Sequence, residues 1–441
     1  MKRIALLLFA AALIASMFTT YAPTFAARMS DEDLAKKREG WYPTGLPLIN
    51  FSSDTGLGYG IRLYLYNNGS KQDAAFAETP YLLQTYIQYF ATTGGWQYHE
   101  LNIDRFKIFG SDFRVKTSFV FEKKLNANYF GQGAETTKNP LRDLSGNEYD
   151  KYEDYQSKFL KANNYNNYTI TAPKASIDIY RNLGDYFKFL LGYQARWIDI
   201  DPWDGRSFEI GLMGGDSYRQ TEETLLHSQR DRITGYDGGW TNFARIGVAL
   251  DTRDFEPDPN NGFYVDYAFE ISDGVLGSEY DYVRSTTGLR AYVTPIRNLT
   301  FAFRAAYTDS SGEVPFYEKG YFAFLLNRYS GLGGYRTLRG YMEDRFIANT
   351  MTMGNAEFRL RFWEVTPWGQ RFAFKLIGFY DVGNAYDNAK DPFDDPRWGD
   401  YKSAYGGGLV IAWNMNTIIH LYYGVSAEET ALSINFMHSL E

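Results

Sequence analysis

The chain of 441 residues contains no cysteine and carries 53 acidic against 45 basic side chains, a formal net charge of −8. The missing cysteines exclude disulfides, thiolate metal sites and cysteine nucleophiles, and the acidic balance disfavours a nucleic-acid partner, which needs a basic surface. The mean hydropathy is −0.40, and beyond the N-terminus no uninterrupted apolar run approaches about 18 residues, so the sequence excludes helical membrane spans.

The N-terminus has the pattern of a secretory signal. Lys2 and Arg3 precede an apolar run over residues 4–17, and the small residues Thr24 and Ala26 mark a cleavage site. The run is shorter than the ~20 residues that a spanning helix needs, which disfavours the alternative of an anchoring helix. We therefore predict a signal peptide over residues 1–26, followed by a short lead-in over residues 27–43.

From residue 44 onward the dominant pattern is the alternation of apolar and polar side chains. In residues 56–66 one face carries Leu57, Tyr59, Ile61, Leu63 and Leu65. Successive side chains of a strand point to opposite faces, so one face suits lipid and the other a wet interior. A soluble sandwich also alternates, but it does not explain the charged side chains on the inner face of strand after strand. A transmembrane β-barrel does.

Counting these runs predicts sixteen strands, an even number that suits a single-chain bacterial barrel. They lie near residues 45–53, 57–66, 79–92, 96–108, 112–124, 168–181, 186–200, 241–252, 262–272, 281–294, 298–308, 354–364, 371–385, 402–414, 417–425 and 430–438. The expected fold is all-β, an antiparallel transmembrane barrel over residues 44–441. Behind the signal peptide, residues 27–43 are expected in the periplasm, or alternatively in the lumen as a plug.

Long links at residues 125–167, 201–240 and 309–353 separate some of these strands, and short links separate the others. If the N-terminus is periplasmic, parity places all three long links outside the cell. Outer-membrane barrels have this asymmetry between long outer loops and short periplasmic turns.

Two segments of the C-terminal half are more specific than alternation. The first joins turn-forming and charged residues just before a clean strand, and consists of Asp251, Thr252, Arg253, Asp254, Pro259 and Gly262. It resembles the periplasmic turn of the BamA/TamA superfamily of outer-membrane assembly barrels. In the second, Leu338, Arg339, Gly340 and Tyr341 resemble the sixth-loop signature of that family, with Leu in place of its usual Val.

A third match, over residues 378–384, places Asp381 at the centre of the family's strand-thirteen motif. The family's arginine contacts this aspartate, so the resemblance implies a long sixth extracellular loop that folds into the lumen and joins Arg339 to Asp381. Alternation independently puts Asp381 on the inner face, and the planar fork of arginine binds a carboxylate through two charge-assisted hydrogen bonds. The pair either only fixes the loop inside the barrel or takes a direct part in gating or substrate handling.

The resemblance implies an outer-membrane location and a function in the insertion or translocation of proteins. A passive pore for small solutes and a structural surface antigen remain as alternatives. The implied partners are outer-membrane lipids, the cell's own barrel-assembly machinery and a client outer-membrane or secreted protein. The family's assembly factors carry periplasmic POTRA domains, for which residues 27–43 are too few, so we expect a barrel-only member.

No catalytic or metal-binding pattern is present in the sequence. The histidines, His99, His227, His420 and His438, are far apart, and none lies in a Ser/His or Asp/His motif. We therefore expect no enzyme activity, no cofactor and no metal site. Residues 430–441 are expected to form a closing strand, with Leu440 on the same face as Leu432.

Overall fold

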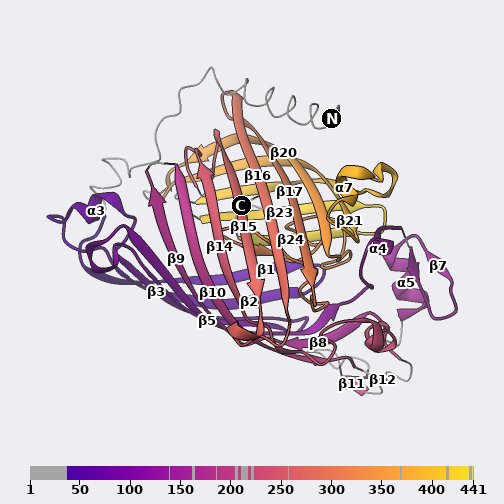
Figure 1. Cartoon of the computed structure of the whole chain (residues 1–441). Coiled ribbons are helices and arrows are strands. Elements are labelled where there is room, and N and C mark those ends of the chain that lie inside the picture. The colour runs from indigo at the N-terminus through magenta and orange to yellow at the C-terminus, as the bar shows by residue number, and fades with distance from the viewer. Residues whose placement is uncertain are drawn as a thin grey trace.

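The computed structural model describes residues 37–440, except 139, 161–163, 185, 204–206, 210–216, 220–222, 257, 368–369, 414–416 and 437–439. Over these residues the chain forms a closed antiparallel β-barrel (Figure 1). The predicted signal peptide and most of the lead-in lie outside the described residues. Within them, no helix is both long enough and apolar enough to cross a membrane.

The prediction of a sixteen-stranded antiparallel barrel is confirmed. The wall strands are β1 (Trp41–Ser52), β2 (Gly56–Asn67), β3 (Leu83–Thr92), β4 (Trp96–Arg105), β5 (Phe113–Asn128), β9 (Lys174–Leu183), β10 (Phe187–Asp201), β14 (Phe243–Asp251), β15 (Gly262–Ser272), β16 (Tyr282–Ile296), β17 (Leu299–Gly312), β20 (Thr350–Val365), β21 (Phe372–Tyr386), β22 (Lys402–Trp413), β23 (Thr417–Ser426) and β24 (Thr430–Phe436). Two short strands, β8 (Asn167–Thr171) and β13 (Gly239–Trp240), extend the wall beside β5 and β10. Each wall strand pairs with the next along the chain, and β24 returns to β1.

Proline explains two differences between the expected and observed strands. The strand expected to begin at residue 79 begins at Leu83, after Pro80, and the strand expected over residues 168–181 is broken at Pro173 into β8 and β9. Proline has no backbone N–H for a sheet ladder, so it is confined to strand ends, edges and bulges.

The wall has one apolar and one polar face. On β14, Ile246 and Val248 point outward and are about half exposed. Their neighbour Arg245 points inward and donates to Asp178 of β9 at 3.0 Å. Apolar side chains therefore form the lipid-facing surface, and charged side chains pair across the inner surface.

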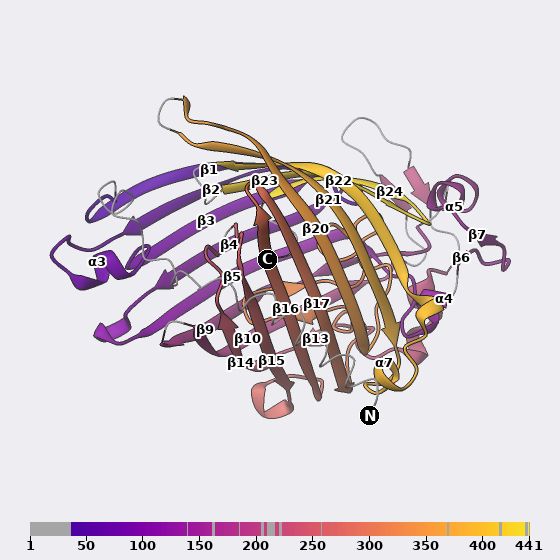
Figure 2. The ribbon, with the colours of Figure 1, turned by 90° about the horizontal axis from the view of Figure 1, so that it is seen from above.

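The two rims of the barrel differ (Figures 1 and 2). One rim carries long connections with α4 (Glu135–Lys138), α5 (Tyr152–Lys158) and α7 (Asp391–Asp394), and the other carries α3 (Ala74–Glu78). The smaller elements of the connections are β6 (Leu141–Arg142), β7 (Glu148–Tyr149), β11 (Ser207–Glu209), β12 (Ser217–Arg219), β18 (Phe322–Ala323), β19 (Arg328–Tyr329), α6 (Leu225–Ser228) and four 3-10 turns, η1 (Ile108–Gly110), η3 (Arg230–Arg232), η4 (Gly274–Leu276) and η6 (Trp398–Asp400). We assign the rim with long connections to the cell exterior, since outer-membrane barrels have long outer loops and short periplasmic turns.

Candidate functional site

The connection between β17 and β20, residues 313–349, lies against the inner face of the wall. Its apolar side chains pack on inward residues of the wall, among them Met351, Met353 and Ala385. The apolar side chains of the connection are almost fully buried and include Phe322, Phe324, Tyr329, Leu332, Leu338, Tyr341 and Phe346. This burial gives the connection an apolar core of its own, shared with β20 and β21.

Arg339 and Asp381 meet through two parallel side-chain hydrogen bonds. Nε and Nη2 of Arg339 donate to Oδ2 and Oδ1 of Asp381 at 2.8 and 2.6 Å, and the backbone N–H of Arg339 donates to Oδ2 at 3.1 Å. Asn355 of β20 adds a fourth bond, from Nδ2 to Oδ1, at 2.8 Å. The guanidinium lies 3.7 Å from the ring centroid of Phe379. The two charged residues are at most 3% exposed, so water competes little for these bonds.

Glu357 is a second carboxylate of this site, and its pairing with Arg339 was not found from the sequence. Nη1 of Arg339 donates to Oε1 of Glu357 at 2.5 Å, and Nε of Arg359 donates to Oε2 at 2.9 Å. Arg339 and Arg359 thus face Asp381 and Glu357 in a buried cluster. A third arginine, Arg304, donates to Asn355 at 2.9 Å. Alternation along β20 was the signal that could have indicated this pairing. Glu357 lies two residues after Asn355 and so on the same inner face, and Asn355 pairs with Asp381 of β21.

The other residues of the loop motif bring the loop onto β23. Gly340 has φ 113°, and an added Cβ would lie 2.9 Å from the backbone of Val425. Ser426 donates from Oγ to the backbone oxygen of Gly340 at 2.7 Å. Leu338 and Tyr341, on either side of Arg339 and Gly340, are buried in the loop's apolar core. Glycine is therefore required at position 340 both by its backbone conformation and by the close approach to β23.

The first half of the loop has separate polar contacts. Glu318 accepts hydrogen bonds from Arg284 of β16 at 3.0 Å and from Arg328 of the loop at 2.8 Å. The backbone N–H of Leu325 donates to Oδ2 of Asp266 on β15 at 2.8 Å. The loop is thus bonded to β15 and β16 through its first half and to β20, β21 and β23 through its second half.

The predicted turn between β14 and β15 lies at the periplasmic rim and is closed by its own side chains. Arg253 donates from Nε and Nη2 to the two oxygens of Asp251, both at 2.9 Å. Asp254 accepts from the backbone N–H of residue 260 at 2.9 Å. Pro259 is buried, and Gly262, with φ 102°, begins β15. The turn is also bonded to the wall, since Lys375 of β21 donates to Asp258 and Lys188 of β10 donates to Asp251 at 2.8 Å. These contacts are separate from those of Arg339 and Asp381.

Strands β1 and β24 close the barrel through a short seam. All twelve residues of β1 pair with β2, but only Phe51 and Ser52 pair with β24. The backbone bond from Ser53 to Leu432, at 3.1 Å, extends this pairing toward the outer rim. The seam is therefore bonded at its outer end, and the periplasmic two thirds of β1 has no ladder with β24 among the described residues.

The sequence of β1 explains why its periplasmic part is a poor partner for β24. Gly40, just before β1, exchanges backbone bonds with Asn68 and Gly69, just after β2, whereas Ser53 bonds to β24. Even-numbered residues of β1 therefore direct their backbone groups to β2, and odd-numbered ones to the seam. Alternate residues of a strand direct their N–H and C=O groups to opposite neighbours. Pro43 and Pro47 therefore stand where N–H groups would point at the seam, and proline supplies none.

Leu440, the one described residue after β24, lies inside the barrel. Leu440 is fully buried beside Tyr292 and Ala302, and its backbone oxygen accepts from Nε of Arg290 at 2.8 Å. The expectation that Leu440 lies on the same face as Leu432 was wrong, since Leu432 is exposed and Leu440 is buried in the lumen. The charged donor on β16 and the apolar contacts on the inner wall hold the residue inside.

At the outer rim, the loop contacts both sides of the seam. The backbone N–H of Glu343 donates to Oδ2 of Asp54, in the turn after β1, at 3.2 Å. Arg345 donates from Nε and Nη2 to Glu428, in the turn before β24, at 2.7 and 2.9 Å. We call these three bonds, together with the bond from Ser426 to the loop, the loop–seam contacts.

Comparison with known families identifies the barrel. A sequence model of the Omp85 superfamily domain matches residues 110–429, which is most of the chain. The chain belongs to the Omp85 superfamily. Residues 25–82 match a further family, a domain of unknown function, DUF5982. No curated protein matches the chain.

Solved structures of similar fold include two Omp85-type neighbours. BamA from Haemophilus ducreyi lacking POTRA domains 1–3 has a TM-score of 0.53 at 12% identity, over 91% of this chain and 71% of that one. CdiB from Escherichia coli has a TM-score of 0.53 at 9% identity, over 91% of this chain and only 64% of that one. At such identities the likeness shows the fold alone. Membership of the superfamily places this Omp85 barrel in the outer membrane.

The described residues hold no group of three or more side chains that could bind a metal ion. His99 lies on the outer face, where its ring stacks on Tyr89 at 4.7 Å. His227 lies in α6, His420 is buried on β23, and His438 lies outside the described residues.

Replacing Arg339 by Ala should destabilise this Omp85 barrel by about 3–5 kcal/mol, because Asp381 and Glu357 stay buried without their shared cation. Asp381→Ala should cost a comparable amount, and the double variant should cost clearly less than the sum. Urea unfolding of the refolded protein in lipid vesicles measures the three values. Arg142→Ala, which breaks the exposed pair with Glu148, is the matched control and should cost at most about 1 kcal/mol. Additive losses would show that Arg339 and Asp381 do not act as a pair.

Alkaline pH should loosen the loop–seam contacts. Burial and the neighbouring Glu343 raise the pKa of Asp54 and of Asp344 to about 7, and burial with Asp54 and Glu428 nearby raises the pKa of Glu429 to about 8. Lys124 has the opposite effect on Glu343, whose pKa is lowered although burial opposes this. The raised values mean that the closed rim binds more protons than an open one, so closure is fully stabilised at acid pH and weakens as pH rises through about 7 to 8.

The measurement is the temperature at which the folded, fast-migrating form is lost on gels, scanned from pH 6 to 9. This temperature should fall with pH in the wild type. In a variant with Asp344→Asn and Glu429→Gln the profile should flatten. An unchanged slope in that variant would show that other groups cause the pH dependence.

Proposed function

We propose that this Omp85 barrel acts in the insertion or translocation of proteins at the outer membrane, through lateral opening between β1 and β24. The observation that carries the proposal is the short seam. Among the residues that the structure describes, which leave out 437–439 just after β24, only Phe51 and Ser52 of β1 are registered with β24. Every other neighbouring pair of wall strands has a longer ladder. The seam is thus the weakest junction of the barrel.

The free part of the β1 edge suits an incoming strand. Backbone groups in a membrane need partners, so an open edge templates the strand that arrives beside it. On the seam side, Gly45 and Ile49 offer both N–H and C=O groups, while Pro43 and Pro47 offer carbonyl oxygens alone. This edge can accept a client strand but forms an incomplete ladder with β24, which favours exchange over permanent closure.

The loop of residues 313–349 is the second part of the proposal. It is bonded to the wall by Arg339 and touches both edges of the seam at the outer rim. We infer that it closes the lumen and holds the outer end of the seam, so that opening begins at the periplasmic end. The motifs that resemble those of assembly barrels, and membership of the Omp85 superfamily, support this assignment.

Locking the seam should abolish the proposed function. The chain has no native cysteine, so Ser52→Cys with Ser433→Cys, a registered pair, introduces one disulfide across β1 and β24. In this proposal opening begins at the periplasmic end, and release of a client into the membrane requires the seam to open to its outer end. We therefore expect loss of client insertion or secretion under oxidising conditions and recovery with a reducing agent. Ser118→Cys with Ser176→Cys, whose hydroxyls lie 2.7 Å apart between β5 and β9, is the matched control and should be silent. A locked seam with full function would contradict lateral opening.

Single-channel conductance separates this proposal from a passive pore. In planar bilayers the wild type should give small, flickering currents, because the loop fills the lumen. Arg339→Ala should lengthen the open events, and deletion of residues 330–348 should give large steady currents. A large steady current in the wild type would favour a solute channel lined by the inward charges.

A further inference from the structure

The outward face of the wall is almost free of charge toward the periplasm. Among the described residues of the wall strands, its periplasmic half carries two charged side chains, Arg105 of β4 and Arg181 of β9. Both are exposed, and both follow outward isoleucines on their strands, Ile103 and Ile179. Other outward charges, such as Lys123 of β5, lie near the outer rim. Two like charges on one part of an apolar surface point to an anion that binds there.

Strand register brings the two arginines to either side of β5. Arg105 is paired with Val115, and Arg181 is paired with Phe113. The arginines are thus two strands and two residues apart, which places their Cα atoms about 12 Å from each other. Each guanidinium lies at the end of a long side chain, so both can reach one anion on the outward face of β5, whereas they can only repel each other.

These cations have no carboxylate partner among the described residues. The guanidinium of Arg181 lies 5.2 Å from the ring centroid of Phe113, and no hydrogen bond or ion pair of Arg105 or Arg181 is present in the described part of the chain. The carboxylate of Asp112 lies 3.7 Å from the ammonium of Lys107, in the turn that joins β4 to β5. Three cations and one carboxylate leave this described end of the three strands with an excess of two positive charges.

Exposed rings place this end of the strands at the membrane interface. Trp41, Phe113 and Phe187 lie at the periplasmic ends of β1, β5 and β10 and are exposed. Aromatic girdles mark the level at which hydrocarbon meets head groups. Phe109, in the turn between β4 and β5, is also fully exposed. Arg181, which is in register with Phe113, therefore lies near the level of the head groups.

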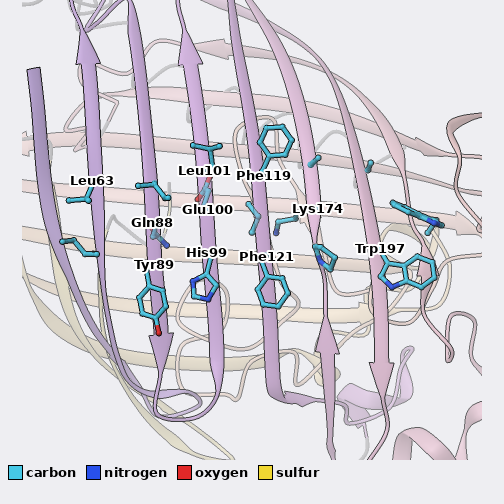
Figure 3. Close-up of a pocket in the computed structure, with 17 residues that line it drawn as sticks. Leu63, Gln88, Tyr89, His99, Glu100, Leu101, Phe119, Phe121, Lys174 and Trp197 are labelled. Carbon is cyan, nitrogen blue, oxygen red and sulfur yellow. The ribbon is translucent and has the colours of Figure 1, made fainter. Parts of the chain in front are cut away.

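From this end an apolar strip runs along the same strands toward the middle of the membrane. Val115 and Ile179 are registered beside each other. Farther from the periplasm, Leu101 and Phe119 lie side by side and line a hollow of about 860 Å³, as Figure 3 shows. Four residues separate Arg105 from Leu101, about 13 Å along a strand, which is close to the ~15 Å of hydrocarbon in one leaflet.

We propose that the periplasmic end of β4, β5 and β9 binds an anionic glycerophospholipid of the periplasmic leaflet. Its phosphate lies between Arg105 and Arg181, since the guanidinium fork binds phosphate oxygens through paired charge-assisted hydrogen bonds. One acyl chain lies on Val115 and Ile179 and extends toward Leu101. The site thus joins two cations at the interface to an apolar strip within the hydrocarbon.

The apolar strip favours a lipid over free phosphate. Inorganic phosphate would meet two exposed arginines in water, where ion pairs are weak, and would leave the strip unused. A lipid adds the contacts of its acyl chain and keeps its phosphate at the level of the arginines. The excess of positive charge favours a head group of net negative charge, because Lys107 repels an ammonium group.

The acids next to the site on these strands face the lumen. Asp104, which precedes Arg105, accepts from Nε of Arg114 on the inner face at 2.7 Å. Asp178 of β9 accepts from Arg245 at 3.0 Å. Their charges are therefore paired on the other side of the wall and leave the outward face positive.

Photo-crosslinking tests the site. The full barrel is placed in phosphatidylethanolamine nanodiscs with a trace of phosphatidylglycerol that carries a diazirine in one acyl chain, and the adducts are mapped by mass spectrometry. We expect adducts concentrated in residues 101–105, 113–119 and 175–181. Arg105→Gln with Arg181→Gln should lower them about fivefold, as expected for the loss of two partly exposed ion pairs. The result does not depend on lateral opening, because β1, β2 and β3 separate the site from β24.

Two control variants separate the effect of charge from that of structure. Arg105→Lys with Arg181→Lys keeps both cations and should retain about half of the adducts or more. Lys123→Gln removes an outward cation at the opposite end of β5 and should leave the adducts unchanged. Migration of the folded form on gels checks that each variant retains its barrel. Adducts spread evenly around the wild-type wall, or unchanged in the doubly neutralised variant, would overturn the site, and so would a co-purifying protein cross-linked to these segments.

Competition identifies the head group. Unlabelled phosphatidylglycerol should displace the probe about two- to fivefold better than phosphatidylethanolamine does, and added salt should reduce this preference because it screens exposed charges. The preference should vanish when both arginines are neutralised, and excess inorganic phosphate should displace none of the probe. Equal displacement by the two lipids would overturn the anionic head group, and displacement by inorganic phosphate would overturn the assignment of a lipid.

Discussion

Within the hydrocarbon of a membrane each backbone N–H and C=O group must find a partner, and the closed sheet of this protein follows from that requirement. Closure fixes the register of each strand, and register fixes which side chains face lipid and which face the lumen. A slip of one residue would turn Arg245 toward lipid and Ile246 toward the charged interior. The alternation that is visible in the sequence is therefore a consequence of closure as much as a cause of it.

The same requirement makes the seam unusual. Fifteen junctions are held by ladders along most of their length, whereas β1 and β24 share a short one at the outer rim. The backbone N–H and C=O groups of β1 that do not pair with β24 need other hydrogen-bond partners, or water from the periplasm. Pro43 and Pro47 reduce the number of N–H groups that need a partner there, and Leu440 lies against Arg290 in the lumen. The sequence thus lowers the cost of an incomplete junction at this place.

The charged interior adds a second level of organisation. Buried ions are costly unless they are paired and hydrogen-bonded, so Arg339 can lie inside the barrel only where carboxylates are placed to pair with it. Asp381 and Glu357 come from neighbouring strands, and Asn355 aligns one of them. Burial removes both charges of the pair from water, and this cost offsets much of their attraction. The pair therefore fixes one position of the loop more than it adds to the stability of the barrel. Gly340 then turns the chain onto β23 with no side chain in the way.

Much of the fold and of the site around Arg339 could be predicted from the sequence, and the features that were missed share one cause. Alternation located the strands, and the resemblance to a known family singled out Arg339 and Asp381. The role of Glu357, the seam-facing prolines and the inward turn at Leu440 were missed. Each of these depends on which strand lies beside which once the barrel has closed, and alternation within one strand carries no such information. Proline at position 43 reads as an ordinary turn former until the register shows which neighbour its missing N–H would have faced.

The loop of residues 313–349 links the seam to the charged interior. Its contacts with Asp54 and Glu428 lie at the end of the seam that retains a ladder, and its bond to Asp381 lies deeper in the barrel. Opening from the periplasmic end disturbs neither, whereas complete separation of β1 from β24 must break the contacts at the rim. The loop is therefore placed to permit partial opening and to resist complete opening. In the proposed lateral opening the wall must part without unfolding, which needs this difference between its two ends, and here the difference arises from one loop and one short ladder.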